Sequence, residues 1–171
     1  MRNLTAIVWL YRGQRERFLA LVQDYFKRHA AECAAVPGKL AAFDTAHRLF
    51  AIRFVERPDL RAYHPDVRIF EVRARDGGLV GIFLSDNYAR PNKRGGAWMN
   101  AYRWQSRAAG GTLPIVVTHS ACARGPAGAP TLLSADDVRT LFHEFGHGLH
   151  GLLSQVTYER LSGTQVLRDF V

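Results

Sequence analysis

The chain has 171 residues, of which 47% are hydrophobic and 22% charged, a balance typical of one soluble globular domain. Its 23 basic and 15 acidic residues give a net charge of +8, but the arginines are scattered rather than gathered in a stripe with aromatic residues. We therefore expect no nucleic-acid partner. We also expect no membrane partner, because no apolar run approaches the ~20 residues that a spanning helix needs.

The cysteines and the first residues bear on the cellular compartment. Cys33 and Cys122 lie far apart and form no CxxC motif, so the sequence shows no disulfide framework. The apolar stretch 4–11 is followed at once by arginines and by no small-residue cleavage site, which argues against a secretory signal. We therefore expect a cytoplasmic location.

Two helices are expected at the N-terminal end of the chain. Residues 14–36 lack Gly and Pro, and their apolar residues recur at helical spacing until Pro37-Gly38 ends the pattern. A second helix is expected at 39–50. Its expected buried face consists of Leu40, Phe43, Ala46, Leu49 and Phe50.

The middle of the chain has the two-residue alternation of β-strands. The expected strands are 51–56, 67–73, 79–84, 97–102 and 113–120. Asp76-Gly77-Gly78 predicts a hairpin turn between the second and third of them. We expect these strands to form a small antiparallel sheet, so the fold class is α+β.

The last expected element is an amphipathic helix that begins after Ser134. Ser134 and Asp137 form an acidic variant of the capping box, which fixes the start of the helix. Apolar residues then recur along one side of five turns. They are Val138, Leu141, Phe142, Phe145, Leu149, Leu152 and Leu153.

This helix contains the motif His143-Glu144-Phe145-Gly146-His147. Because an α-helix has 3.6 residues per turn, His143 and His147 project from one side and can bind one Zn²⁺ at ~2.0–2.1 Å. Glu144 flanks that position, where it can take a proton from a zinc-bound water and return it to a leaving amine. We therefore expect zinc as the cofactor. The alternative is that two polar histidines simply occupy a partly exposed helix face.

Two further features of this helix constrain the site. Gly146, Gly148 and Gly151 each cost ~1 kcal/mol relative to Ala, so they indicate close approach to the helix, by a ligand or by packing. His150 lies ~10.5 Å further along the axis than His143, too far for both to bind the same ion. We expect His150 to have a structural or supporting role.

A zinc peptidase needs three protein ligands and a water. The helix supplies two, so the third must come from another element. Glu159 and Asp169 are the carboxylates that follow the helix, and neither lies in an obvious second-helix position. A complete small zinc protease would have to use one of them.

Several short strings make the sequence resemble a known family. They are Tyr63-His64-Pro65-Asp66-Val67, Gly95-Gly96-Ala97-Trp98-Met99, residues 141–147, Leu161-Ser162-Gly163-Thr164 and Arg168-Asp169-Phe170-Val171. Over about residues 39–171 the sequence resembles the thimet oligopeptidase and oligopeptidase A family of zinc metallopeptidases. The resemblance is closest to its bacterial peptidyl-dipeptidases, the dipeptidyl carboxypeptidases. Residues 1–38 show no such resemblance, so we expect an N-terminal helical segment, 1–38, followed by a partial catalytic domain, 39–171.

The resemblance implies a role for each site residue. His143 and His147 would be zinc ligands and Glu144 the general base. The strand with Gly96, Ala97, Trp98 and Met99 would line the cleft and bind an extended oligopeptide by strand addition. The third ligand would be a Glu just beyond Val171, and the transition-state-stabilising groups would also lie outside this sequence. The complete catalytic domain implied by the resemblance is larger and mainly helical.

These expectations define the functional hypotheses. The first is a zinc-dependent peptidase that releases C-terminal dipeptides from oligopeptides, with this chain alone weakly active or inactive. The rival is a non-catalytic interaction or regulatory fragment that binds a partner through exposed strand edges or its basic surface. In either case, open edges and exposed apolar patches favour self-association.

Overall fold

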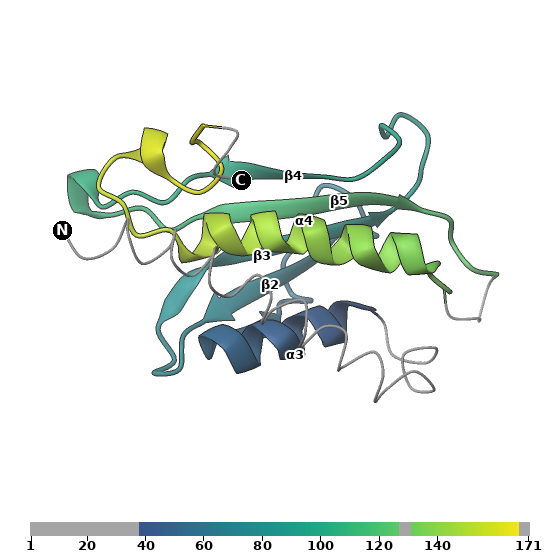
Figure 1. The fold of residues 1–171 in the computed structure, drawn as a ribbon, viewed down its shortest axis with the longest axis horizontal. Helices are drawn as coiled ribbons and strands as arrows, with labels where there is room; N and C mark the ends of the chain where they lie inside the picture. Colours follow the sequence, from purple (N-terminus) through teal and green to yellow (C-terminus); the bar gives the residue numbers. More distant parts are fainter. Residues whose placement is uncertain (1–37, 127–130, 168–171) are drawn as a thin grey trace.

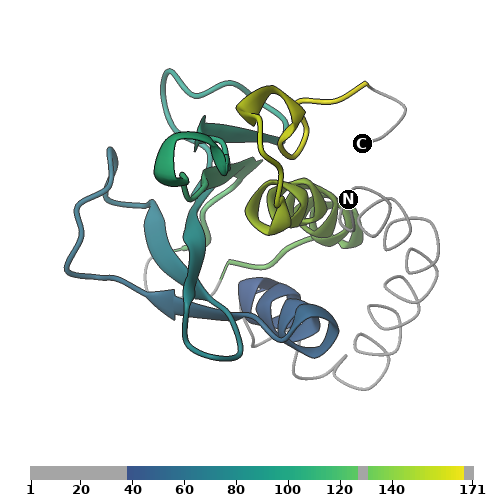
Figure 2. The same cartoon turned by 90° about the vertical axis from the view of Figure 1, so that its left-hand side faces the viewer.

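The structure is a computed structural model that describes residues 38–126 and 131–167. In it, a five-stranded sheet carries two helices on one face (Figures 1 and 2). The strands are β1 (Arg53–Glu56), β2 (Arg68–Arg73), β3 (Leu79–Tyr88), β4 (Trp98–Arg103) and β5 (Ile115–Cys122); the helices are α3 (Gly38–Phe50) and α4 (Ala135–Leu153). Short 3₁₀ turns lie at Ala108–Gly110 and Glu159–Leu161. None of the described helices is long and apolar enough to cross a lipid bilayer.

The sheet is mixed, and the expectation of an antiparallel sheet was wrong. Its strand order is β1-β2-β3-β5-β4, and β3 pairs with β5 in parallel while the other neighbours are antiparallel. The strand positions themselves were predicted correctly. Alternation reports which residues lie in a strand and which face is buried, but it is the same for both pairing directions. The β-branched run of β5 fits its central place, since strands with neighbours on both sides and two covered faces are rich in such residues.

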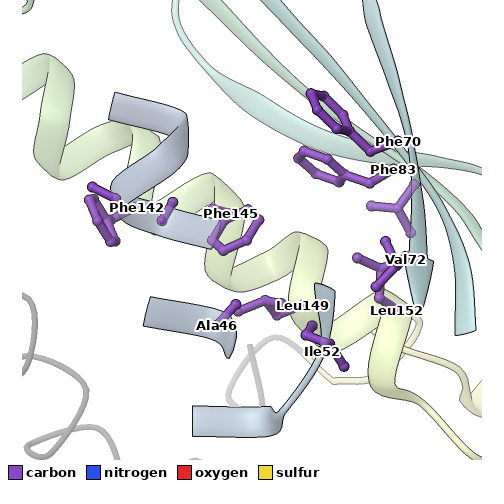
Figure 3. Close-up of a cluster of buried hydrophobic side chains, with 12 residues drawn as sticks. Ala46, Ile52, Phe70, Val72, Phe83, Phe142, Phe145, Leu149 and Leu152 are labelled. Carbon is purple, nitrogen blue, oxygen red and sulfur yellow. The ribbon is translucent and has the colours of Figure 1, made fainter. Parts of the chain in front are cut away.

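The main core lies between the sheet and the two helices (Figure 3). From the sheet, the buried residues include Phe70, Val72, Phe83 and Val116; from α4 they are Phe142, Phe145, Leu149 and Leu152. Burial of each such side chain contributes roughly 1.5–3 kcal/mol to folding. The apolar side predicted for the last helix is therefore confirmed as the side that faces the sheet.

The face expected to be buried on helix α3 is confirmed in part. Ala46 is completely buried, and Phe43 and Phe50 are partly buried and pack against the main core. The Phe43 ring stacks on Phe54 with centroids 4.1 Å apart and meets Phe83 edge to face. The other buried residues of the helix are small and were not predicted, namely Ala41, Ala42 and Thr45. Small side chains let a helix backbone approach its neighbours closely, and the larger rings then fill the space beside it.

The other face of the sheet is also covered in part. The segment between β1 and β2 contributes Ala62 and Val67, which pack with Leu84 of β3 and Val117 of β5 in a second apolar cluster. Phe83 and Leu84 are neighbours in β3 but belong to different clusters, as the alternation of a strand requires. The central strands are therefore buried on both faces.

Some expectations concern parts of the chain that are not described. The helix predicted at 14–36 lies outside the described residues, as do most of the segment 1–38 and the string 168–171. The division of the chain at residue 38 therefore stays a prediction.

Candidate active site

Helix α4 begins at a complete capping box, as the sequence predicted. The Ser134 hydroxyl accepts a hydrogen bond from the Asp137 backbone amide at 3.1 Å, and the Asp137 carboxylate accepts one from the Ser134 amide at 2.9 Å. Hydrogen bonds from Ser134 lower the pKa of Asp137, so its carboxylate stays charged at the positive end of the helix dipole. This cap sets the first turn of α4 and, through it, the position of the histidines two turns later.

Gly151 lets α4 lie close to the sheet. A Cβ atom added there would stand 3.1 Å from the Val116 side chain, whereas one at Gly148 would make ordinary contact with Phe83 and Thr118 at 3.4 Å. Of the two explanations that the sequence left open, tight helix packing accounts for Gly151. The close packing also fixes the rotation of α4 about its axis, and hence the direction in which its polar side chains project.

The two histidines of the motif converge on one point. The Nε2 atoms of His143 and His147 lie 3.0 Å apart, and the rings meet edge to face at 88°. Two nitrogens bound to one tetrahedral zinc at ~2.0–2.1 Å would lie ~3.3 Å apart. The pair therefore fits a metal ion with little adjustment of either side chain.

His147 has the electrostatic properties of a metal ligand. Burial lowers the pKa of His147, and repulsion from His143 and His150 lowers it further, so the ring is neutral at neutral pH. A neutral imidazole is the form that binds a metal. Its Nδ1 atom is buried and has no hydrogen-bond partner among the described residues. A histidine that binds a metal through Nε2 normally donates a hydrogen bond from Nδ1. An acceptor outside the described residues would complete this arrangement.

Glu144 turns away from the solvent and toward β4. It is only 8% exposed, and burial raises its pKa, while the charge of His143 and a hydrogen bond from the Met99 backbone act in the opposite direction. A raised pKa makes a carboxylate a better proton acceptor near neutral pH. Glu144 thus contacts the edge strand through the Met99 backbone, a contact that the sequence motif alone did not predict.

Strand β4 is the last strand of the sheet, with β5 on one side and no strand on the other among the described residues. The residues expected to bind peptide lead into it: Gly96 is exposed, while Ala97, Trp98 and Met99 are partly exposed. Met99 packs against the main core, and Trp98 lies opposite His119 of β5, with its ring stacked on the imidazole at 4.6 Å. An edge strand held in this way presents backbone groups to which an extended peptide can add.

Among the described residues, no third metal ligand is found near the pair. Across 38–126 and 131–167, no three His, Cys, Asp or Glu side chains are grouped closely enough to hold a metal ion. Glu159 is exposed in a 3₁₀ turn and does not join His143 and His147, and neither does His150. Asp169 lies outside the described residues. The structure therefore brings together two candidate ligands and the candidate base.

Sequence reasoning missed a buried ionic cluster near β4. Asp86, at the end of β3, is completely buried and accepts hydrogen bonds from four side chains, those of Tyr63, Arg90, Lys93 and His119. The available signal was a lone carboxylate inside an apolar strand, because such a group is almost never fully buried unless it is paired.

A helix with two converging histidines, a flanking buried glutamate and an adjacent sheet edge is the arrangement of metallopeptidases with the HExxH motif. The sequence model of Peptidase family M3 matches residues 12–171, and the chain belongs to this family. The matched range begins inside the N-terminal segment for which the sequence analysis found no resemblance. The strings quoted above therefore identified the correct family.

The chain is similar to several curated proteins of this kind. It is 48% identical to the dipeptidyl carboxypeptidase of Escherichia coli over 129 residues, which are 75% of the chain and 19% of that protein. It is 38% identical to oligopeptidase A of Escherichia coli over 159 residues, or 92% of the chain and 23% of that protein. It is 30% identical to a thimet-like oligopeptidase of Dictyostelium discoideum over 133 residues, 75% of the chain and 20% of that protein. The chain thus spans about a fifth of the length of these relatives.

Proposed function

We propose that the protein to which this sequence belongs is a zinc-dependent peptidase that releases dipeptides from the C-terminus of oligopeptides. The single observation that carries the proposal is the 3.0 Å approach of the two histidine Nε2 atoms on the helix that also presents Glu144 to β4. The 48% identity to a dipeptidyl carboxypeptidase favours dipeptide release over internal cleavage.

Each residue has a defined part in this proposal. His143 and His147 would hold the zinc ion through Nε2, and the bound ion would polarise the scissile carbonyl and increase the acidity of a water. Glu144 takes a proton from the attacking water and returns it to the leaving nitrogen, a role suited to a carboxylate whose pKa is raised by burial. The backbone of β4 holds the peptide extended beside Glu144. A third protein ligand would come from outside the described residues.

We infer that the 171-residue chain by itself is weakly active or inactive. The described residues bring together two ligands, whereas a catalytic zinc site uses three. Among the described residues we identify no hydrogen-bond donor for the developing oxyanion. Loss of one such donor can lower the rate ~10²–10³-fold. Zinc binding and hydrolysis should therefore be tested separately.

Zinc binding tests the assignment of the ligands. The purified chain is dialysed against zinc and its metal content is measured, together with the His143→Ala and His147→Ala variants. His47→Ala is the control, because His47 is an exposed histidine of α3. We expect both site variants to lose zinc and the control to retain it. Equal zinc content in all four proteins would refute the ligand assignment.

Hydrolysis tests the type of peptidase. The substrate is an N-terminally blocked peptide with a free C-terminus, and the products are followed by mass spectrometry. We expect slow, chelator-sensitive loss of C-terminal dipeptides and little cleavage of the C-terminally amidated peptide. Internal cleavage of both peptides would instead indicate an oligopeptidase, in line with the 38% identity to oligopeptidase A.

A second candidate function is non-catalytic binding of a partner chain. The open edge of β4 favours it, since such an edge pairs with another strand whether or not hydrolysis follows. The same edge, with the exposed side chains of Tyr102, Leu132, Tyr158 and Leu167, supports self-association of the chain. Light scattering over a range of concentrations tests this; a monomer at all concentrations would contradict it.

A further inference from the structure

We propose that Asp86 is a positioning residue that holds the beginning of β4 in the conformation to which a peptide adds. The inference rests on the proposed function, because it assigns to β4 the task of binding substrate. Asp86 itself lies on the sheet face opposite α4, since it follows Leu84 by two residues and shares its side. It therefore acts through the residues that it binds and not by contact with zinc or peptide.

The Asp86 carboxylate gathers four partners from separate parts of the chain. Its oxygens accept hydrogen bonds from Tyr63 Oη at 2.7 Å, from both Arg90 Nη atoms at 2.6 and 2.8 Å, and from Lys93 Nζ at 2.8 Å. His119 Nδ1 lies 3.2 Å away. One buried negative charge thus faces the basic side chains of Arg90 and Lys93, which stabilise the ionised carboxylate inside the protein.

Lys93 ties the loop before β4 to the ends of two neighbouring strands. Its side chain is 4% exposed, and its ammonium group also lies 3.0 Å from the Asp86 carbonyl oxygen, 2.9 Å from that of Tyr88 and 2.6 Å from that of Ser120. Lys93 lies five residues before Trp98, where β4 begins. Lys93 therefore fixes the position of the loop that leads into β4.

His119 makes a second connection between Asp86 and β4. One side of the imidazole meets the Asp86 carboxylate, and its face stacks on Trp98 with the planes 20° apart. The backbone register agrees, because His119 is the partner of Asp86 in β3 and of Trp98 in β4. Three adjacent strands are thus joined in one row by a hydrogen bond and a ring stack.

This arrangement matters because β4 is an edge strand. Among the described residues, β5 is its one neighbouring strand, so the first residues of β4 are among those expected to open locally. A peptide that binds to an already ordered strand does not have to supply the free energy of ordering it. Asp86 therefore contributes to peptide affinity by ordering β4 in advance.

The test compares Asp86→Asn with the unchanged chain in two measurements. The first is hydrogen exchange without peptide; we expect faster exchange at the amides of residues 97–100 and unchanged exchange in β2. The second is affinity for an N-acetylated hexapeptide with a reduced, uncleavable amide, which we expect to fall roughly three- to tenfold. Zinc content at His143 and His147 should not change.

Two further variants keep the result decisive. Lys93→Met removes the loop tether but leaves the Asp86–Arg90 ion pair, so it reports on β4 if Asp86→Asn does not fold. Glu71→Gln is the matched control, because Glu71 also accepts from two arginines, Arg57 and Arg73, but lies in β2. We expect it to leave exchange in β4 and peptide affinity unchanged.

The outcomes distinguish the positioning role of Asp86 from the proposed binding of peptide to β4. Unchanged exchange at residues 97–100 in both Asp86→Asn and Lys93→Met would overturn the positioning role, whatever the peptide does. A uniform rise in exchange over the whole sheet would overturn it too, because it would show a general loss of stability. If the unchanged chain does not bind the peptide, the proposed substrate site fails instead, and the exchange data still decide whether Asp86 orders β4.

Discussion

The carboxylate of Glu144 in α4 lies beside the backbone of Met99 in β4, whose hydrogen bond lowers the pKa of that carboxyl against the larger effect of burial. This contact joins the helix that carries the candidate metal ligands to the edge strand that would bind peptide. It also buries the Glu144 carboxylate in part. Removing a charged group from water costs free energy, which packing elsewhere must offset. Stability and function therefore make opposite demands on this residue.

We expect Glu144→Gln to abolish hydrolysis while the protein keeps its stability and its zinc content. A folded-state pKa above the unfolded value means that ionised Glu144 destabilises the fold at neutral pH, so a neutral amide of the same shape relieves this cost. We expect the free energy of unfolding in urea at pH 7 to stay equal or rise, while any peptidase activity falls at least ~10²-fold. A large loss of stability would show that the carboxylate is a structural group instead.

The cap of α4 predicts a measurable loss of stability. Ser134→Ala removes the side-chain oxygen that accepts from the Asp137 amide, and we expect a cost of ~1 kcal/mol in the free energy of unfolding. Thr140→Ala is the control on the same helix, because Thr140 is exposed and Ala is the better helix former. It should be neutral or slightly stabilising. Equal effects of the two variants would contradict the capping role.

The positions of α3, α4 and the five strands could be predicted because their signals are local. Alternation marks a strand and helical spacing marks a helix, whatever lies next to them. The convergence of His143 and His147 was predictable for the same reason, since a separation of four residues determines it. The strand order was not, because insertion of β5 between β3 and β4 depends on contacts that no short window contains.

The errors have physical causes as well. In α3, Phe43 and Phe50 pack against the main core as expected, but the most deeply buried residues also include Ala41, Ala42 and Thr45, which were not predicted. Burial depends on the distance to the neighbouring element as well as on hydrophobicity. The Asp86 cluster was missed because its members are spread from Tyr63 to His119 and meet only in the folded sheet.

Acid should weaken the fold through Asp86. Burial acts to raise the pKa of Asp86, but hydrogen bonds from Arg90, Lys93 and Tyr63 outweigh it and hold the pKa well below its usual range. The stabilisation is therefore complete above the unfolded value of ~3.9 and is lost as the pH falls through it toward the lower folded value. The difference in unfolding free energy between the unchanged chain and Asp86→Asn should shrink between pH 5 and pH 3. A difference that stays constant over this window would contradict the assignment.

Two glycines near the C-terminal end of α4 and Gly163, in the segment that follows it, predict a graded series of stability effects. At Gly148 a methyl group would make ordinary contact at 3.4 Å, so Gly148→Ala should be neutral or gain up to ~1 kcal/mol from helix propensity. At Gly163 it would lie 2.8 Å from the Gly151 Cα atom, and the backbone φ of +54° is also unfavourable for alanine. Gly163→Ala should therefore cost ~1–3 kcal/mol.

Gly151→Ala should fall between these two variants, because its methyl group would meet the Val116 side chain at 3.1 Å and that side chain has to give way. Urea unfolding of the three proteins gives the order directly. If Gly163→Ala were as stable as Gly148→Ala, the segment after α4 would not be packed against Gly151. The chain beyond the helix, which leads toward any third ligand, would then follow a different path from the one in the structure.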